Sequence, residues 1–541
     1  MRSFAALLLG TLMAASSLSS QELSTAVYPS EDELLEALQA SEIDYYQFLI
    51  LQEVISHGVD STNSHLLDEI PNLSSLFSTA ATAATSLEND QRAGFVGRPA
   101  RRGGPVRRIS HQYSQDMAED GPSRYRTSCR IGLSKEVLLA LNVHREFSGR
   151  ERVVSRSLTF RNAEHIVREV TLGSFSRRLG LGTVFGYRGK LFEFADHLDG
   201  ESLLFPDYGG FNGVYVRAVG RNLGSEVLTS VHRDQTHEMV TAGGSLSMTK
   251  LPFQPEVIVG VTRLSNRVSG QNIDDTKYAV SSVYDYDRGN VRMEGCGQAG
   301  ERPSWGALVI EGRHYYSAMD LRYAAWAYSA EYLDLTGGSK AANIRTTDSI
   351  PEVEFSYSQK RAGQKGGLLK SVARLDHDLD VVSSFLCAGR NADTVNVQFL
   401  AGLVKRYGRK YEIRLDYLNK SATRVATEVS QRVRLEGRML AEGLTARGYV
   451  AYTASNERDD YASVFVTVRR SWKDIGTLEL WASLGRIDLE QVAVDYWYGY
   501  VKTEQKLFAE VSAGVKLSHR YDRQAGEQHR SVILVEVTAW L

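Results

Sequence analysis

Two stretches decide the fold: KYEIRLDYL at Lys410–Leu418 and QRVRLEGRM at Gln431–Met439. In the first, charged residues occupy the even positions 410–416 and apolar or aromatic residues the odd ones. Successive side chains of a β-strand point to opposite faces, so this period of two predicts strands with one apolar and one charged face. The same pattern recurs at Glu352–Ser358, Glu510–Leu517 and Val532–Leu541.

Strands of this kind fit two architectures. A soluble sandwich would turn the apolar faces into a core, whereas a transmembrane barrel turns them to lipid and the charged faces to the lumen. Strand-like segments recur from residue 106 to the C-terminus with no helical segment between them, and aromatic residues such as Tyr411 and Tyr417 flank the apolar faces, as interface girdles require. We therefore predict an all-β fold, a large antiparallel transmembrane β-barrel of about 20–26 strands, over residues 106–541 and preceded by a small N-terminal helical segment. We expect tight turns at Asp287–Gly289 and Gly408–Lys410 and a longer loop at Leu333–Pro351.

The N-terminus has the organisation of a secretory signal peptide. Arg2 supplies the charged region, Phe4–Ala15 supplies the apolar region, and small residues follow as far as Ser20, after which we predict cleavage, with Ser17 as the alternative site. An uncleaved anchor is disfavoured, because the apolar run is well short of the ~20 residues that a spanning helix needs. No later run of about 18 apolar residues occurs. A signal peptide for export, together with a transmembrane β-barrel, predicts a location in the cell outer membrane.

Residues 21–85 have a helical pattern, and residues 86–105 form a basic linker. Within the helical segment, DSTNSHLLDEIPNLS at Asp60–Ser74 resembles one half of a helix-hairpin-helix unit. Its motif positions are Asp60, Asn63, Leu66, Leu67, Ile70, Pro71 and Leu73. Asn72 stands where the hairpin glycine is expected, and the following stretch, Ser78–Ser86, is small and polar instead of forming an arginine-bearing second helix. These departures favour a helical cap or plug over a nucleic-acid site.

LGSFSRRLGLGTVFGYRGKL, at Leu172–Leu191, carries five glycines among apolar, aromatic and arginine residues. So many glycines disfavour a helix and suit twisted strands that need close backbone approach. We interpret the stretch as a strand, a tight turn and the next strand of the barrel wall. Arg177, Arg178 and Arg188 would then point to the lumen or a rim, and something would pack against this wall from inside.

The same stretch carries a resemblance to a known family through Leu172, Gly173, Phe175, Leu179, Gly180, Gly182 and Gly186. It is similar to a motif of large outer-membrane β-barrel proteins of the Bacteroidetes and neighbouring phyla, which have helix-hairpin-helix-like segments at their N-termini. The order of helical segment, hairpin-like motif, arginine-rich linker and barrel also resembles that family over nearly the whole chain. Since the family is largely uncharacterised, the resemblance implies location and fold but little function.

Composition and motifs argue against several function classes. The 63 Lys and Arg balance 65 Asp and Glu, which does not suit a global nucleic-acid binder. The chain has no nucleophile elbow and no phosphate-binding loop, and its 12 histidines lack ligand spacing. DHDLD at Asp376–Asp380 is interpreted as a solvated acidic loop, with a calcium site as the alternative. We predict no enzyme activity, no cofactor and no metal site; a disulfide among Cys129, Cys296 and Cys387 is left open.

Three functional hypotheses remain. The favoured one is a channel or transport barrel with a charged lumen, in which rings of arginine and glutamate select the solute. The N-terminal segment either plugs this lumen or leaves it open. The second is a non-conducting scaffold or assembly component, and the third is a DNA-handling or enzymatic barrel. The expected partners are outer-membrane lipid and a periplasmic or envelope protein. The candidate lumen-facing residues are Glu412, Arg414, Arg432, Arg434, Glu436, Arg177 and Arg178.

Overall fold

The computed structural model describes residues 107–117, 123–134, 136–145, 151–162, 165–186, 204–206, 210–248, 250–342, 346–390, 394–408, 410–423, 427–441, 443–456, 460–472, 475–488, 493–508, 511–523 and 528–540. The predicted signal peptide, helical segment, hairpin-like motif and linker therefore lie outside the described residues.

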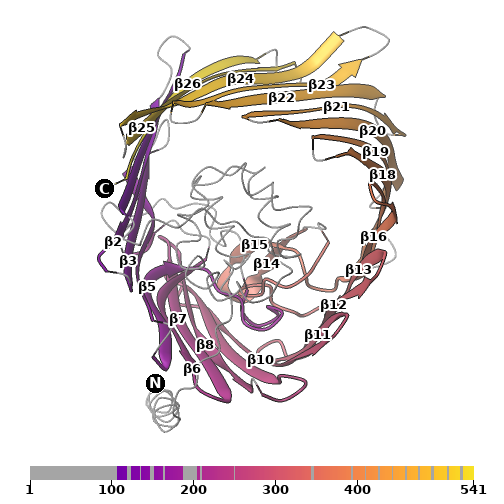
Figure 1. Cartoon of the computed structure of the whole chain (residues 1–541). Helices are drawn as coiled ribbons and strands as arrows, with labels where there is room; N and C mark the ends of the chain where they lie inside the picture. Colours follow the sequence, from indigo (N-terminus) through magenta and orange to yellow (C-terminus); the bar gives the residue numbers. More distant parts are fainter. Residues whose placement is uncertain are drawn as a thin grey trace.

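Of the 26 described strands, 24 close into one antiparallel barrel (Figure 1). β1 (Arg107–Asp116) pairs with β2 (Ser123–Gly132) on one side and with β26 (Gln528–Trp540) on the other, which completes the ring. Each strand pairs with its neighbours in chain order, except that β13 (Met319–Tyr328) pairs directly with β16 (Lys365–Asp376). The predicted all-β transmembrane barrel, with its predicted range of strand numbers, is confirmed.

The remaining strands of the ring are β3 (Val137–Arg145), β4 (Glu151–Arg161), β5 (Val167–Phe175), β6 (Phe211–Val219), β7 (Leu223–Arg233), β8 (His237–Met248), β9 (Glu256–Asn266), β10 (Asn272–Tyr286), β11 (Gly289–Gly300), β12 (Ser304–Tyr316), β17 (Leu379–Gly389), β18 (Val395–Tyr407), β19 (Tyr411–Thr423), β20 (Thr427–Ala441), β21 (Leu444–Ser455), β22 (Tyr461–Trp472), β23 (Gly476–Asp488), β24 (Ala493–Phe508) and β25 (Val511–Asp522). Among the described residues, none of the helices has the length and apolar character needed to cross a bilayer.

The outer surface of the barrel is apolar, as the alternation predicts. Leu415, Leu435 and Val450 face one another across β19, β20 and β21, and their exposed fractions are 45, 54 and 56%. Their sequence neighbours Asp416 and Glu436 are buried on the other face. Exposed leucines and valines on every second position form the surface that hydrocarbon chains solvate.

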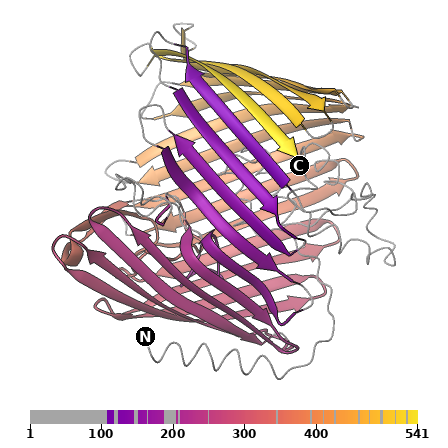
Figure 2. The same cartoon turned by 90° about the vertical axis from the view of Figure 1, so that its left-hand side faces the viewer.

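Most strands are joined by short connections. The turns at Asp287–Gly289 and Gly408–Lys410 lie between β10 and β11 and between β18 and β19, as predicted. Two connections are much longer, residues 176–210 and residues 329–364. Because neighbouring strands alternate in direction, both leave the same end of the barrel. The second contains β14 (Thr346–Ile350) and β15 (Phe355–Gln359), which lie inside the ring, while the wall strands run tilted around it (Figures 1 and 2).

The interpretation of Leu172–Leu191 as two wall strands is wrong. β5 ends at Phe175, and residues 176–186 continue as an irregular segment inside the barrel; residues 187–191 lie outside the described range. Gly180 and Gly182 have φ values of +57° and +85°. These left-handed conformations do not occur in an extended strand, so the segment does not continue as a second wall strand, and glycine adopts them without the steric cost that a side chain would add.

The assignment of Glu352–Ser358 to the wall is also wrong. Pro351–Val353 forms a 3₁₀ helix (η3), and β15 pairs with β14 in a separate two-stranded sheet. The alternation arises because Val353, Phe355 and Tyr357 are buried in a cluster with residues of the inner wall. A period of two identifies an extended segment with one apolar face, but it does not identify what covers that face.

The apolar outer surface predicts that an added charge destabilises the barrel more on its outer face than on its inner face. Replacing Leu435 with Arg should lower the free energy of unfolding by roughly 2–4 kcal/mol if this position lies near the bilayer midplane. Urea titration of the protein in lipid vesicles measures this change. Ser463→Arg, which places the same charge on the inner face of β22, is the matched control and should cost less; equal losses would contradict the assignment of faces.

Candidate functional site

An inner layer covers one side of the barrel interior; we use this name for the described parts of residues 176–186 and 329–364. Its side chains Leu181, Phe185 and Tyr332 are at most 2% exposed. They belong to one apolar cluster with wall residues of β6 to β13, among them Ile258 and Trp326. This layer is part of the packed core, because its apolar side chains are buried against the wall and not merely suspended in the lumen.

The wall is shaped to receive Phe185. Gly243 of β8 and Gly260 of β9 are register partners, and both face the interior. A Cβ atom on either would lie only 2.5 or 2.4 Å from Cζ of Phe185. The phenyl ring therefore occupies volume that exists only because these two wall positions have no side chain.

Glu294 anchors the first segment of the inner layer to β11. Its carboxylate is fully buried and accepts hydrogen bonds from the backbone N–H groups of Leu181 (2.5 Å) and Thr183 (2.8 Å), and from the Thr183 hydroxyl. Such bonds to backbone donors compensate for the cost of burying the carboxylate. Residues 180–183 are thereby fixed against the wall.

The two segments of the inner layer are also bonded to each other. The Tyr332 hydroxyl donates to the carbonyl oxygen of Thr183 at 2.5 Å, and the Thr336 hydroxyl donates to that of Val184 at 2.7 Å. Burial raises the pKa of Tyr332 well above its usual range, so its hydroxyl stays protonated as a donor. Residues separated by about 150 positions in sequence thus form one unit.

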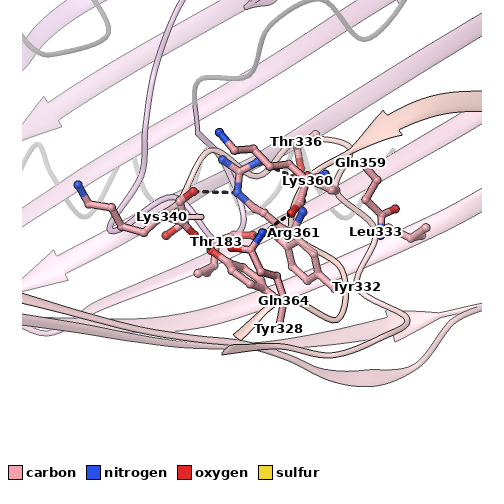
Figure 3. Close-up of polar contacts among 12 residues, drawn as sticks. Thr183, Tyr328, Tyr332, Leu333, Thr336, Lys340, Gln359, Lys360, Arg361 and Gln364 are labelled. Carbon is pink, nitrogen blue, oxygen red and sulfur yellow. Dashed lines mark hydrogen bonds and ion pairs between the residues drawn. The ribbon is translucent and has the colours of Figure 1, made fainter. Parts of the chain in front are cut away.

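A buried ion pair closes the second segment on itself. Nη1 of Arg361 lies 2.9 Å from Oδ1 of Asp334, whose side chain is completely buried. Oδ2 of Asp334 accepts the backbone N–H groups of Lys360 and Arg361, and Nε of Arg361 donates to the carbonyl oxygen of Ser339 at 2.8 Å (Figure 3). Burial alone would lower the pKa of Arg361, but the Asp334 carboxylate together with Tyr328 and Tyr332 more than offsets this, and the pKa is raised. We call this pair the Asp334–Arg361 clamp.

Two wall strands hold the second segment in place. Lys277 of β10 pairs with Asp275 at 2.8 Å, and its ammonium also donates to the carbonyl oxygen of Leu333 at 2.6 Å. On β13, the indole N–H of Trp326 donates to Oε1 of Gln364 at 2.8 Å. The layer is therefore tied to the wall by polar contacts as well as by apolar packing.

The opposite part of the wall carries the lumen candidates of β19 and β20. Glu412, Arg414, Arg432, Arg434 and Glu436 all sit at positions alternating with the exposed apolar ones. Asp416, which the sequence interpretation did not select, lies between Arg414 (2.7 Å) and Arg434 (2.6 Å). Glu436 pairs with Arg447 of β21 at 2.6 Å. Arg414, Arg434 and Glu436 therefore belong to one ion-pair ladder on the inner face, whereas Glu412 pairs with Arg406 of β18 at 3.3 Å.

Arg177 and Arg178 lie elsewhere, at the start of the inner layer. Arg177 pairs with Glu169 of β5 and lies 4.6 Å from the ring centroid of Tyr215. Arg178 donates to the carbonyl oxygen of Leu181 at 2.8 Å. The structure thus separates them from the β19–β20 ladder and gives them contacts that hold the layer. Arg188 lies outside the described residues.

Basic side chains exceed acidic ones on the inner face of β18–β25, counting only the side chains that the structure describes. The basic residues there are Arg406, Arg414, Lys420, Arg432, Arg434, Arg438, Arg447, Arg469, Lys502, Lys506, Lys516 and Arg520. The acidic residues there are Glu412, Asp416, Glu436, Glu479 and Glu504. This part of the inner face therefore has a net positive charge.

The anchors of the inner layer had no signal in the sequence. Glu294 and Thr183 are 111 residues apart, and Asp334 and Arg361 are separated by 27. Glu294, Asp334 and Arg361 are each a single charge in an ordinary strand or loop, and only the closed barrel brings them to their partners. By contrast, Asp416 stands in the same alternating stretch as Glu412 and Arg414, so the same pattern could have identified it.

No group of three or more His, Cys, Asp or Glu is arranged to hold a metal ion within the described part of the chain. In the Asp376–Asp380 turn, Asp378 pairs with Lys405 and Asp380 with Arg406, each at 2.6 Å. All three cysteines are free thiols.

Comparisons with known proteins leave the family open. No family model and no curated protein matches the chain. Among solved structures, it is similar to the ferric-catecholate import receptor Fiu from E. coli K12 (9% identity, TM-score 0.41, covering 81% of this chain and 82% of that one). It is also similar to the siderophore receptor PirA from Pseudomonas aeruginosa (9%, 0.45, 81% and 80%) and to the P pilus usher PapC translocation pore (8%, 0.37, 81% and 99%). Such scores are too low to assign the chain to any of these groups.

The Asp334–Arg361 clamp predicts a local effect of mutation. Arg361→Met leaves a buried carboxylate without its cation, a change that typically costs about 3–5 kcal/mol. We expect faster amide hydrogen exchange in residues 329–342, measured by mass spectrometry, with the barrel still resistant to detergent. Lys340→Met removes a half-exposed cation of the same segment and should leave exchange nearly unchanged. Equal protection in wild type and Arg361→Met would show that the clamp does not hold the layer.

Proposed function

We propose that the protein is an outer-membrane channel that passes small anionic solutes along the inner face of β18–β25. The net positive charge of that face supports this proposal. Fixed charges of one sign on a low-dielectric wall raise the local concentration of ions of the opposite sign and select among them. The ion pairs of Asp416 and Glu436 hold the arginines in fixed positions, which suits a selective path better than a non-selective one.

The inner layer has a second role in this proposal. It fills part of the cross-section on the side of β6–β13 and leaves the charged face as the route for solute. The N-terminal segment, which the sequence suggests as a plug, would reduce passage further. Outer-membrane lipid and a periplasmic or envelope protein are the proposed partners, and kinship with the Bacteroidetes barrel family belongs to the same proposal.

Ion selectivity tests the proposal. In planar bilayers under a KCl gradient, we expect a reversal potential that indicates preference for chloride. Arg432→Glu together with Lys502→Glu should lower the anion-to-cation permeability ratio by roughly twofold or more. Arg470→Glu reverses a single charge on the outer face of β22 and should leave the ratio unchanged.

The current itself separates channel from scaffold. A steady current that grows when residues 21–104 are removed would support an N-terminal plug. Preference for cations would contradict the anion path, and no current from either form would contradict the channel and favour the non-conducting scaffold.

A further inference from the structure

Five aromatic side chains meet on the inner face of four neighbouring strands. They are Tyr449 of β21, Phe465 of β22, Trp481 of β23, and Tyr498 and Tyr500 of β24, and we call them the aromatic arc. Tyr449 pairs directly with Phe465 in the register, as does Trp481 with Tyr500. Each alternates with outward residues such as Val450, Val466 and Val501, which are 45–56% exposed.

The rings of the arc are in continuous contact. The centroids of Tyr449 and Phe465 are 5.2 Å apart, and those of Phe465 and Trp481 are also 5.2 Å apart. Trp481 in turn contacts Tyr498 and Tyr500, with ring centroids 5.1 and 5.6 Å apart, and the rings of Trp481 and Tyr500 are nearly parallel. The arc therefore presents a connected aromatic surface and not five isolated side chains.

This surface is not explained by the packing of the barrel. Aromatic girdles of membrane barrels face outward at the two interfaces, whereas the arc faces inward. All five side chains are partly exposed, and none of them belongs to the buried clusters that the described inner layer forms with the wall. Partly exposed aromatic surface inside a charged barrel is where a ligand with an apolar face gains the most from being bound.

Cations flank the arc at both ends. Nζ of Lys516 lies 3.8 Å from the ring centroid of Tyr500, and the guanidinium carbon of Arg434 lies 5.7 Å from that of Tyr449. Glu479 accepts the hydroxyl hydrogen of Tyr500, so this carboxylate is already engaged at the β23–β24 end. At the other end Glu436 pairs with Arg447. Arg434 and Arg447 are likewise engaged by Asp416 and Glu436, so the positive charge beside the arc that these carboxylates do not pair with is that of Lys516.

We propose that the aromatic arc is a binding site for a short oligosaccharide that carries carboxylates, such as a chain of uronic acids. This inference rests on the proposed channel function and names its substrate class. Aromatic rings stack on the apolar faces of cyclic solutes, and the flanking cations pair with carboxylates. Neighbouring strands are about 4.8 Å apart, so four strands give a surface about 15 Å long, which suits several linked rings better than one.

Single-channel recording on the full chain tests the site. Trigalacturonate is the charged probe, maltotriose is the neutral probe and benzoate is the single aromatic acid. We expect brief, concentration-dependent blocks by trigalacturonate at concentrations at least tenfold below those needed for the other two. Trp481→Ala with Tyr500→Ala should weaken this block by roughly tenfold or more, because it removes two adjacent stacking rings, and leave the open conductance close to that of wild type. Lys516→Gln should reduce the advantage of trigalacturonate over maltotriose.

The same strand offers a matched control. Trp497 lies on β24 next to Tyr498, but it faces outward and stacks on His519. Trp497→Ala should leave the block unchanged. An open channel that no probe blocks, or a block that survives loss of both Trp481 and Tyr500 in a protein with normal detergent resistance, would overturn the site while leaving the channel proposal intact. A stronger block by benzoate would overturn the assignment of an oligosaccharide and identify an aromatic acid as the ligand of the arc.

Tryptophan fluorescence separates this result from failure of the channel. If the protein carries no current, trigalacturonate should still change the emission of wild-type protein in detergent, and Trp481→Phe should abolish the change. Such a change without current would keep the site and reject the channel. No change in emission and no block would reject the site.

Discussion

The structure depends on closing the sheet, because a bilayer offers no water to backbone N–H and C=O groups. β1 and β26 meet over the whole stretch from Arg108–Trp540 to Asp116–Val532, so the ring has no free edge. β13 pairs directly with β16, so the residues between them are not part of the wall, and the structure places their described part inside the ring.

Placing chain inside the ring divides the wall into two parts with different side chains. Where the inner layer packs, the wall offers small residues such as Gly243, Gly260, Ala307 and Ala324, which give the layer room. On β18–β25 the inner face carries arginine, lysine and glutamate instead. One sheet can hold both because each position on the inner face is chosen independently of the lipid-facing residue beside it.

The sequence predicts what depends on neighbours along the chain. The alternation around Leu415 and Leu435 identifies the strands and their two faces, since these follow from the period of two. The membrane barrel follows from the run of strand-like segments without helices, the flanking aromatic residues and the predicted signal peptide. The alternation cannot distinguish a wall strand from β15, because both have one apolar face: that of the wall strand faces lipid, and that of β15 is buried inside the barrel. Glu294 and the Asp334–Arg361 clamp are also invisible in the sequence, since their partners come together only after the ring and the inner layer have formed.

The way the inner layer is held bears on how a solute would pass. Its attachments include three carboxylates that are at most 2% exposed, those of Glu294, Asp334 and Asp275, each bonded within the layer or to a group that contacts it. Releasing the layer would expose its apolar side chains and separate buried charges from their partners, and both changes cost free energy. A path along β18–β25 requires neither change. The layer is therefore better suited to be a fixed lining of the barrel than a gate, and in the proposed channel the charged and aromatic face opposite it would select the solute.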